Sequence, residues 1–101
     1  MSFNRDEFEI LRKIKKNPTA SQRKLATELG FSLGKLNYCL KALQKKGLVK
    51  AENFKKNPKK INYFYILTPT GLATKTKLTL NFMKKKMKEY DELKSEINIR
   101  K

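Results

Sequence analysis

Hydrophobic positions recur every three or four residues in the first part of the chain, which predicts amphipathic helices. The first is expected from about Asn4 to Lys16 and ends before Asn17-Pro18, because proline disfavours a helical residue before it and cannot donate a backbone hydrogen bond. The second is expected over residues 22–29, with Ser21 as its N-cap. Gly30 follows and suits the left-handed conformation that closes a helix.

A third helix is expected after a three-residue turn, with Ser32 as its N-cap and Gly47 at its end. Projected at about 100° per residue, one side of this helix is apolar and holds Leu36, Leu40 and Leu43, with Cys39 at its margin. The opposite side is small or polar and holds Gly34, Tyr38, Lys41 and Lys45, flanked by Lys35 and Asn37. The pattern predicts a buried leucine stripe and an outward face. That face either contacts a partner or is an ordinary solvated surface.

The pattern then becomes that of strands. Residues Val49–Phe54 and Ile61–Leu67 are expected to pair, and the second segment is rich in β-branched and aromatic residues. The turn between them holds Lys55, Lys56, Lys59 and Lys60. Thr68-Pro69 marks the start of one long helix of about 30 residues, because an N-cap is followed by proline at the first helical position. Gly71 falls in the first turn of this helix, where we expect it to cost little.

Apolar side chains continue along the long helix at an approximate three-to-four spacing, interrupted by Lys94. A domain of about 60 residues cannot cover so long an apolar face, so the distal half needs a partner helix, and an identical copy is the simplest supplier. The residues expected to form the dimer contact are Leu80, Met83, Met87, Tyr90 and Ile97.

Residues 25–49, together with both ends of the hairpin, resemble a known family. The matching residues in the second and third helices and the turn between them are Ala26, Gly30, Leu36 and Leu40. The matching segments at the hairpin are Lys46-Gly47-Leu48-Val49 and Leu67-Thr68-Pro69-Thr70-Gly71. In these features the chain resembles the MarR-type winged helix-turn-helix regulators. Through residues 32–43 it is most similar to the small exopolysaccharide-associated kind.

The resemblance implies a mainly α fold with a small β-hairpin (α+β), in which a winged helix-turn-helix over residues 1–68 precedes a dimerisation helix over residues 69–101 that forms a dimeric coiled coil. It also implies a sequence-specific regulator of transcription, most simply a repressor, that binds a pseudo-palindromic DNA duplex as a homodimer. Two departures limit what is carried over. Only one helix follows the hairpin, so a small-molecule effector site is doubtful, and the wing offers lysines where the family commonly has an Asp-x-Arg arrangement.

Charge agrees with a polyanionic partner. The chain has 25 Lys+Arg against 9 Asp+Glu, a net charge of +16, and the excess runs along the whole folded pattern. An RNA-binding or ribosome-associated protein would show the same total. A protein-interaction module that docks through the wing and the long helix is a further alternative.

The outward face of the third helix is the part expected to read bases, with Asn37 suited to adenine, Lys35 to guanine and Tyr38 to a thymine methyl or a phosphate. The start of the second helix is expected to contact a phosphate. The hairpin lysines are expected either to contact phosphates or to reach into a minor groove. Lysines also discourage strand pairing, which is the alternative explanation for them. The full set of expected DNA contacts is Ser21, Arg23, Lys24, Ser32, Gly34, Lys35, Asn37, Tyr38, Lys41, Lys55, Lys56, Lys59 and Lys60.

Catalysis is not expected. Cys39 is the only cysteine and the chain has no histidine, which leaves no base for nucleophilic chemistry and too few ligands for a Cys/His zinc site. We therefore expect no enzyme activity, metal or cofactor. The absence of a signal peptide or an apolar run of spanning length predicts a cytoplasmic prokaryotic protein that is associated with the nucleoid when bound and has no membrane partner.

Overall fold

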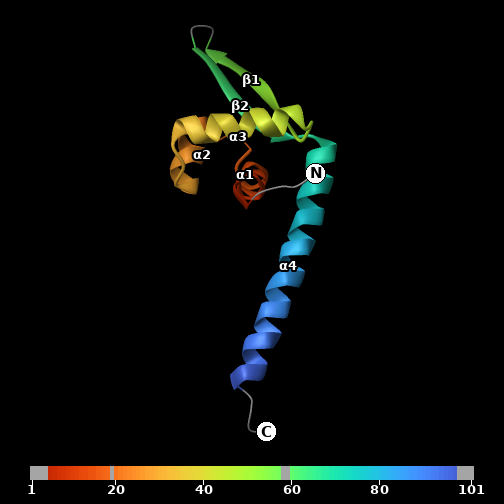
Figure 1. The fold of residues 1–101 in the computed structure, drawn as a ribbon. Coiled ribbons are helices and arrows are strands. Elements are labelled where there is room, and N and C mark those ends of the chain that lie inside the picture. The colour runs from red at the N-terminus through yellow and green to blue at the C-terminus, as the bar shows by residue number, and fades with distance from the viewer. Residues whose placement is uncertain (1–4, 19, 58–59, 98–101) are drawn as a thin grey trace.

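A helical head with a β-hairpin and a long projecting helix make up the protein (Figure 1). The computed structural model describes residues 5–18, 20–57 and 60–97, and for residues 53–57 and 60–63 it describes the backbone. The elements are α1 (Arg5–Lys16), α2 (Gln22–Leu29), α3 (Leu33–Lys45), β1 (Val49–Asn57), β2 (Lys60–Leu67) and α4 (Pro69–Ile97). This order confirms the expected mainly α architecture with a hairpin. Asn4, the expected start of the first helix, lies outside the described residues.

Two serine caps and a glycine define the start of α2 and the tight turn between α2 and α3. The Ser21 hydroxyl accepts from the backbone N–H of Lys24 at 3.1 Å, and the Ser32 hydroxyl accepts from that of Lys35 at 3.1 Å. Each bond satisfies an amide that has no partner inside its helix. Gly30 has φ 73° and closes α2, where a residue with a side chain would be strained. The predicted caps are thereby confirmed.

The core of the head lies where α1, α2 and α3 meet the first residue of β1. The leucine stripe of α3 is fully buried, as predicted, and Cys39 beside it is 6% exposed. The buried apolar residues in this cluster are Ile10, Leu11, Ile14, Ala20, Leu25, Ala26, Leu36, Cys39, Leu40, Leu43, Leu48 and Val49. Burying one such leucine stabilises a fold by about 1.5–3 kcal/mol, so this cluster fixes the direction in which the other side of α3 points.

The hairpin is antiparallel and longer than the sequence pattern predicts. Val49 pairs with Leu67, and the register continues to Asn57 opposite Lys60, with an irregularity between Phe54 and Asn57. Three of the four lysines assigned to the turn therefore belong to strands instead: Lys55 and Lys56 to β1, and Lys60 to β2. Cross-strand hydrogen bonding extends the ladder through residues whose own strand propensity is low. Lys59 lies outside the described residues.

A joint of backbone and hydroxyl groups connects α4 to the base of the hairpin. The Thr68 hydroxyl donates to the Gly47 carbonyl at 2.6 Å and accepts from the Gly71 N–H at 2.9 Å, while the Thr68 N–H donates to the Leu48 carbonyl at 3.0 Å. A Cβ atom at Gly71 would overlap the Leu48 carbonyl. Gly71 is thus required for close packing, which corrects the expectation that it merely costs little.

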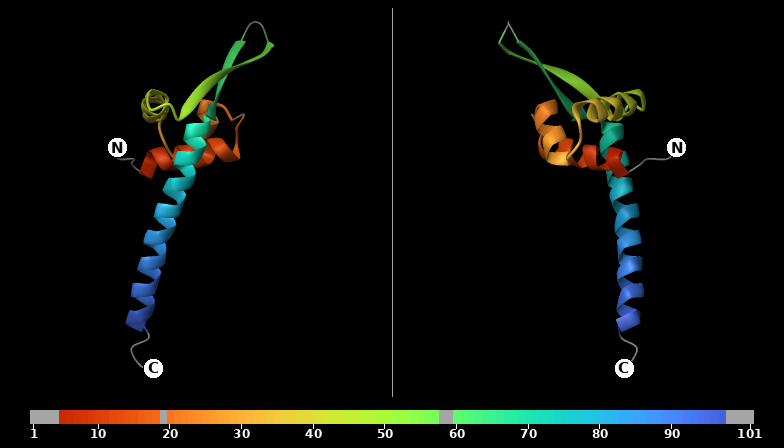
Figure 2. Two further views of the ribbon diagram at one scale, coloured as in Figure 1. Left: turned by 90° about the vertical axis from the view of Figure 1, so that its right-hand side faces the viewer. Right: turned by 60° about the vertical axis from the view of Figure 1, so that its left-hand side comes forward.

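Beyond this joint, α4 first packs along the head and then leaves it. Phe82 stacks on Phe8 of α1 with ring centroids 4.7 Å apart, and Leu78 packs against the core. The distal half extends away, and both views in Figure 2 place its end opposite the hairpin. The molecule measures 68 × 25 × 21 Å. Among the described residues, no helix combines the length and apolar character that crossing a membrane requires.

Candidate nucleic-acid interface

The face of α3 opposite the leucine stripe is open to solvent. Tyr38 is 77% exposed, and Asn37 and Lys41 are exposed beside it. No atom lies within 4 Å of the position a Cβ would take on Gly34, so a partner can approach the backbone closely there. A hollow of about 690 Å³ along this face is lined by Tyr38, Lys41, Ala42, Gln44 and Lys45. The helical projection predicted that this side of α3 faces outward, and its exposure confirms that prediction.

Lys35 differs from its neighbours on α3. Its ammonium group lies 3.1 Å from the Asp6 carboxylate of α1 and 4.2 Å from the centre of the Phe31 ring. The sequence favoured Lys35 as a residue that reaches outward to guanine. In the structure its charged end is directed toward α1 instead.

A second ion pair joins α1 to the other end of α3. Glu7 is buried and accepts from the Lys46 ammonium at 2.8 Å. Since a buried carboxylate without a partner would be costly, this pair fixes α3 relative to α1. Local sequence patterns do not reveal the pair, because its partners are 39 residues apart.

The start of α2 is connected to the hairpin. Ser21, Arg23 and Lys24 are exposed, and Gln22 between them donates from Nε2 to the Tyr65 hydroxyl of β2 at 2.9 Å. This bond fixes the base of the hairpin against the first turn of α2. Tyr65 was interpreted only as a strand residue, and its positioning role depends on a tertiary contact that the sequence pattern does not reveal.

Unpaired positive charge remains on this side of the head. Within the described part of the chain, Arg23, Lys24, Lys41 and Lys45 are exposed and have no ion-pair partner. Of the hairpin lysines, Lys55, Lys56 and Lys60 follow the two strands away from α3. On α3 itself, the exposed cations Lys41 and Lys45 line the same hollow as Tyr38.

Cys39 has the surroundings of an inert thiol. Burial raises its pKa, the carboxylates of Asp6 and Glu7 raise it further, and Lys35 partly opposes them. A raised pKa keeps the thiol protonated and unreactive at neutral pH. The described residues hold no group of three or more His, Cys, Asp or Glu side chains that could bind a metal ion.

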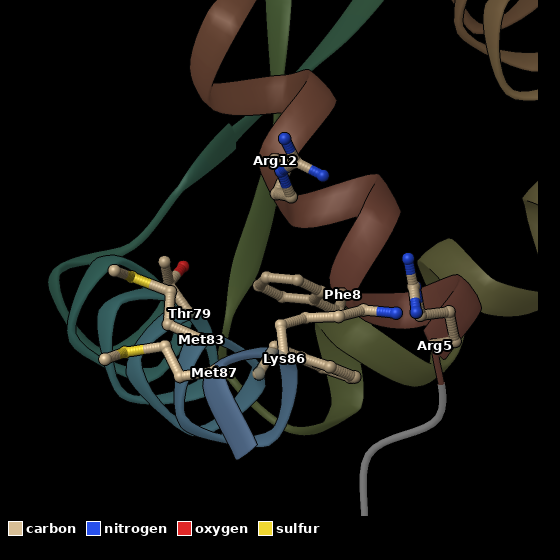
Figure 3. A pocket seen from close by; sticks show the side chains of 8 residues that line it. Arg5, Phe8, Arg12, Thr79, Met83, Lys86 and Met87 are labelled. Carbon is tan, nitrogen blue, oxygen red and sulfur yellow. The ribbon is translucent and has the colours of Figure 1, made fainter. Parts of the chain in front are cut away.

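The apolar residues of distal α4 form a second exposed surface. Leu80 is 53% exposed and Ile97 is 82% exposed, with Met83, Met87 and Tyr90 between these values. The stripe borders a groove of about 390 Å³ between α1 and α4, where Phe8 faces α4 and Arg5 and Arg12 lie along α1 on either side of it (Figure 3). The groove is lined by Arg5, Phe8, Arg12, Thr79, Phe82, Met83, Lys86 and Met87. The expected dimer residues are thus brought to one uncovered surface.

Comparison with known proteins agrees with this architecture. The sequence profile of a winged helix-turn-helix DNA-binding family matches residues 5–50, which comprise α1, α2, α3 and the start of β1. The chain has the fold of the MarR family of transcription regulators. No curated protein is significantly similar to it in sequence.

Three solved structures illustrate the MarR fold of this chain. The zinc-responsive MarR family member ZitR of Lactococcus lactis is 18% identical, with a TM-score of 0.71 over 92% of this chain. FabT of Streptococcus pneumoniae, solved in complex with DNA, is 20% identical with a TM-score of 0.71 over 90% of this chain and 62% of its own. MarR of Staphylococcus aureus, in complex with salicylate and kanamycin, is 21% identical with a TM-score of 0.72 over 96% of this chain and 68% of its own. The present chain spans 62% of the length of ZitR.

Proposed function

We propose that this protein regulates transcription by binding a specific double-stranded DNA site, most simply as a repressor that occludes a promoter. The observation that carries the proposal is the exposed face of α3, where Asn37, Tyr38 and Lys41 lie opposite a fully buried leucine stripe. In a helix-turn-helix the N-terminal part of the second helix enters the major groove. Here that part begins directly after the cap at Ser32, with Gly34 leaving room for close approach.

Each group of candidate residues takes a defined role in the complex. Asn37 suits an adenine edge, and the Tyr38 ring suits a thymine methyl group. Arg23 and Lys24, with the free N–H groups at the start of α2, suit a phosphate. The hairpin lysines, Lys55, Lys56, Lys59 and Lys60, supply phosphate or minor-groove contacts that hold the protein without reading sequence.

Homodimerisation completes the proposal. A row of apolar side chains this exposed is unfavourable in water, and a second copy of α4 would cover it along residues 80–97. Two heads related by a two-fold axis bind a pseudo-palindromic site. FabT, which has a similar fold, was solved with DNA, which supports a duplex as the ligand rather than structured RNA or a protein surface. No small-molecule effector is included in the proposal.

Discrimination between DNA sequences provides the decisive test. A cognate site is first selected from random duplexes, and Asn37→Ala and Tyr38→Ala are then compared with the parent protein. Each should lose about 1–3 kcal/mol of binding free energy on the cognate site, the usual worth of a good base contact, and little on random duplex. Ser95→Ala, at an exposed position on distal α4 outside the proposed DNA interface, serves as the control. Full discrimination in both variants would contradict the assignment of α3 as the reading helix.

Salt dependence separates the proposed function from its alternatives. Replacing the four hairpin lysines with alanine should weaken binding to all duplexes alike. The slope of log affinity against log salt should fall by about 0.9 for each phosphate that the protein no longer neutralises. Competition with structured RNA measures which nucleic acid is preferred. A protein-docking module would show no salt-sensitive binding to duplex DNA at all.

A further inference from the structure

Lys35 is a cation at the N-terminal end of α3, within the proposed interface. It lies in the first turn of α3, directly after Gly34, in the part of the helix that enters the major groove of DNA. Its backbone N–H is bonded to the cap at Ser32, so the start of its side chain is fixed. The direction of the ammonium group therefore decides whether Lys35 contacts DNA.

Two groups attract that ammonium toward the body of the protein. The Asp6 carboxylate is 3.1 Å from Nζ, and the Phe31 ring centre is 4.2 Å from Nζ, a cation–π distance. The Lys35 and Asp6 side chains are 47% and 41% exposed, so the pair lies at the edge of the interface and is not part of the core. Exposed pairs of this kind shift an equilibrium by about fivefold or less.

The other cations of the interface are not restrained in this way. Arg23, Lys24 and Lys41 are exposed and form no ion pair within the described ranges of the chain. Bringing Lys35 onto a phosphate would break its pair and leave the Asp6 carboxylate unneutralised beside a polyanion. The duplex gains less from this lysine than from its neighbours, because the energy of the pair with Asp6 is lost when the ammonium moves to a phosphate.

We propose that Asp6 is a positioning residue that withholds Lys35 from DNA and so limits the sequence-independent affinity of the protein. This inference rests on the proposed function. It assigns to α1, a helix outside the helix-turn-helix pair, a direct influence on how strongly α3 contacts a duplex. It also removes Lys35 from the set of base-reading residues, because the ammonium is held away from the base edges.

Binding to a random duplex of fixed length, measured over a series of salt concentrations, tests the proposal with the full chain. Asp6→Asn keeps the size of the side chain and frees Lys35. We expect up to about fivefold tighter binding at low salt and a log–log salt slope steeper by up to about 0.9, because Lys35 can then neutralise one more phosphate. Asp6→Glu keeps the carboxylate and should retain the slope of the parent protein.

Glu9→Gln is the matched control, since it makes the same change in net charge on the same helix. Glu9 pairs with Arg5 at 3.6 Å and Arg12 at 3.2 Å, and neither is a member of the proposed DNA interface. It should leave the slope unchanged. Equal slopes for Asp6→Asn and Glu9→Gln would overturn the proposal.

The double variant Asp6→Asn, Lys35→Ala removes the pair without changing the net charge. We expect it to bind like the parent protein, because Lys35 contributes nothing in the parent complex. A slope about 0.9 lower than that of the parent would show that Lys35 already contacts phosphate and would overturn the proposal. A parent protein that binds no duplex in a salt-dependent manner would instead contradict the proposed function.

Discussion

The head and the distal half of α4 differ in whether their apolar residues are buried or exposed. In the head, most apolar residues of α1, α2 and α3 lie within one buried cluster, and the cap residues Ser21 and Ser32 each accept a hydrogen bond from a backbone N–H of the helix that follows. In distal α4, by contrast, a stripe of apolar residues is more than half exposed, namely Leu80, Met83, Met87, Tyr90, Leu93 and Ile97. The head has the core of a unit that can be stable as a single chain. The distal helix carries an apolar surface that the rest of the described chain leaves exposed. Under the proposed dimerisation a second copy covers it, and its stability should then depend on protein concentration.

Leu40→Ala should cause the largest loss of stability. It removes a fully buried side chain from the centre of the head, and we expect a loss of about 2–5 kcal/mol in the free energy of unfolding. Denaturant unfolding followed by circular dichroism measures it. Leu80→Ala makes the same chemical change in the exposed stripe and should matter only at concentrations where the protein dimerises. Equal losses at all concentrations would contradict the contrast between the two regions.

Gly71→Ala should destabilise the joint between them. The new methyl group would overlap the Leu48 carbonyl, and we expect a loss of about 1–3 kcal/mol in the free energy of unfolding. Gly34→Ala is the control, because it lies in the first turn of α3 with open space around it and alanine is the better helix former. Thermal unfolding of both variants measures this effect, and the midpoint of Gly71→Ala should be lower than that of Gly34→Ala. A Gly71→Ala protein as stable as its control would mean that α4 is not fixed to the hairpin base.

Met87→Gln should weaken dimerisation and leave the head folded. Met87 is 63% exposed near the middle of the stripe, and covering it in a dimer removes apolar surface from water in both copies. We expect a dimer dissociation constant about tenfold higher or more, measured by analytical ultracentrifugation. Lys88→Gln changes the neighbouring exposed position as the control. A parent protein that is monomeric at tens of micromolar would exclude this interface altogether.

Cys39 should show the smallest effect, which concerns pH. Its pKa is raised from an ordinary value of 9.0, chiefly by burial, so the unfolded chain loses the thiol proton before the folded protein does. The contribution of this group to stability is therefore complete below pH 9.0 and declines as the pH rises through and above that value. Iodoacetamide should modify the native thiol more slowly than the urea-unfolded thiol. Equal rates at pH 8 would show that Cys39 is accessible.

Sequence patterns predicted the elements because the determinants of those elements are local. Ser21, Gly30 and Ser32 define helix ends through hydrogen bonds or backbone angles within a few residues, and the spacing of leucines defines the buried side of α3. The exposed apolar stripe on α4 follows from the same periodicity. What binds the outward face of α3 remains a prediction, since periodicity shows exposure and not the ligand.

The contacts that position the interface could not be predicted, because they join residues far apart in the chain. Tyr65 bonds Gln22 across 43 positions, and Gly71 is needed only because the Leu48 carbonyl lies where a side chain would be. The extent of β1 was missed for a related reason. Its lysines and asparagines favour a turn locally, but pairing with β2 places them in a strand.

The hydroxyl of Thr68 has a consequence for the geometry of an operator. Because it bonds Gly47 and Gly71 at once, and Phe82 stacks on Phe8 further along, we expect α4 to act as a rigid extension of the head rather than a flexible tether. Two heads on flexible tethers would tolerate many distances between half-sites, since each would act through its effective concentration near the DNA. Heads joined through rigid arms accept one distance and one rotational phase. Inserting half a helical turn, about five base pairs, between the half-sites would place the second half-site on the opposite side of the duplex, beyond the reach of the second head.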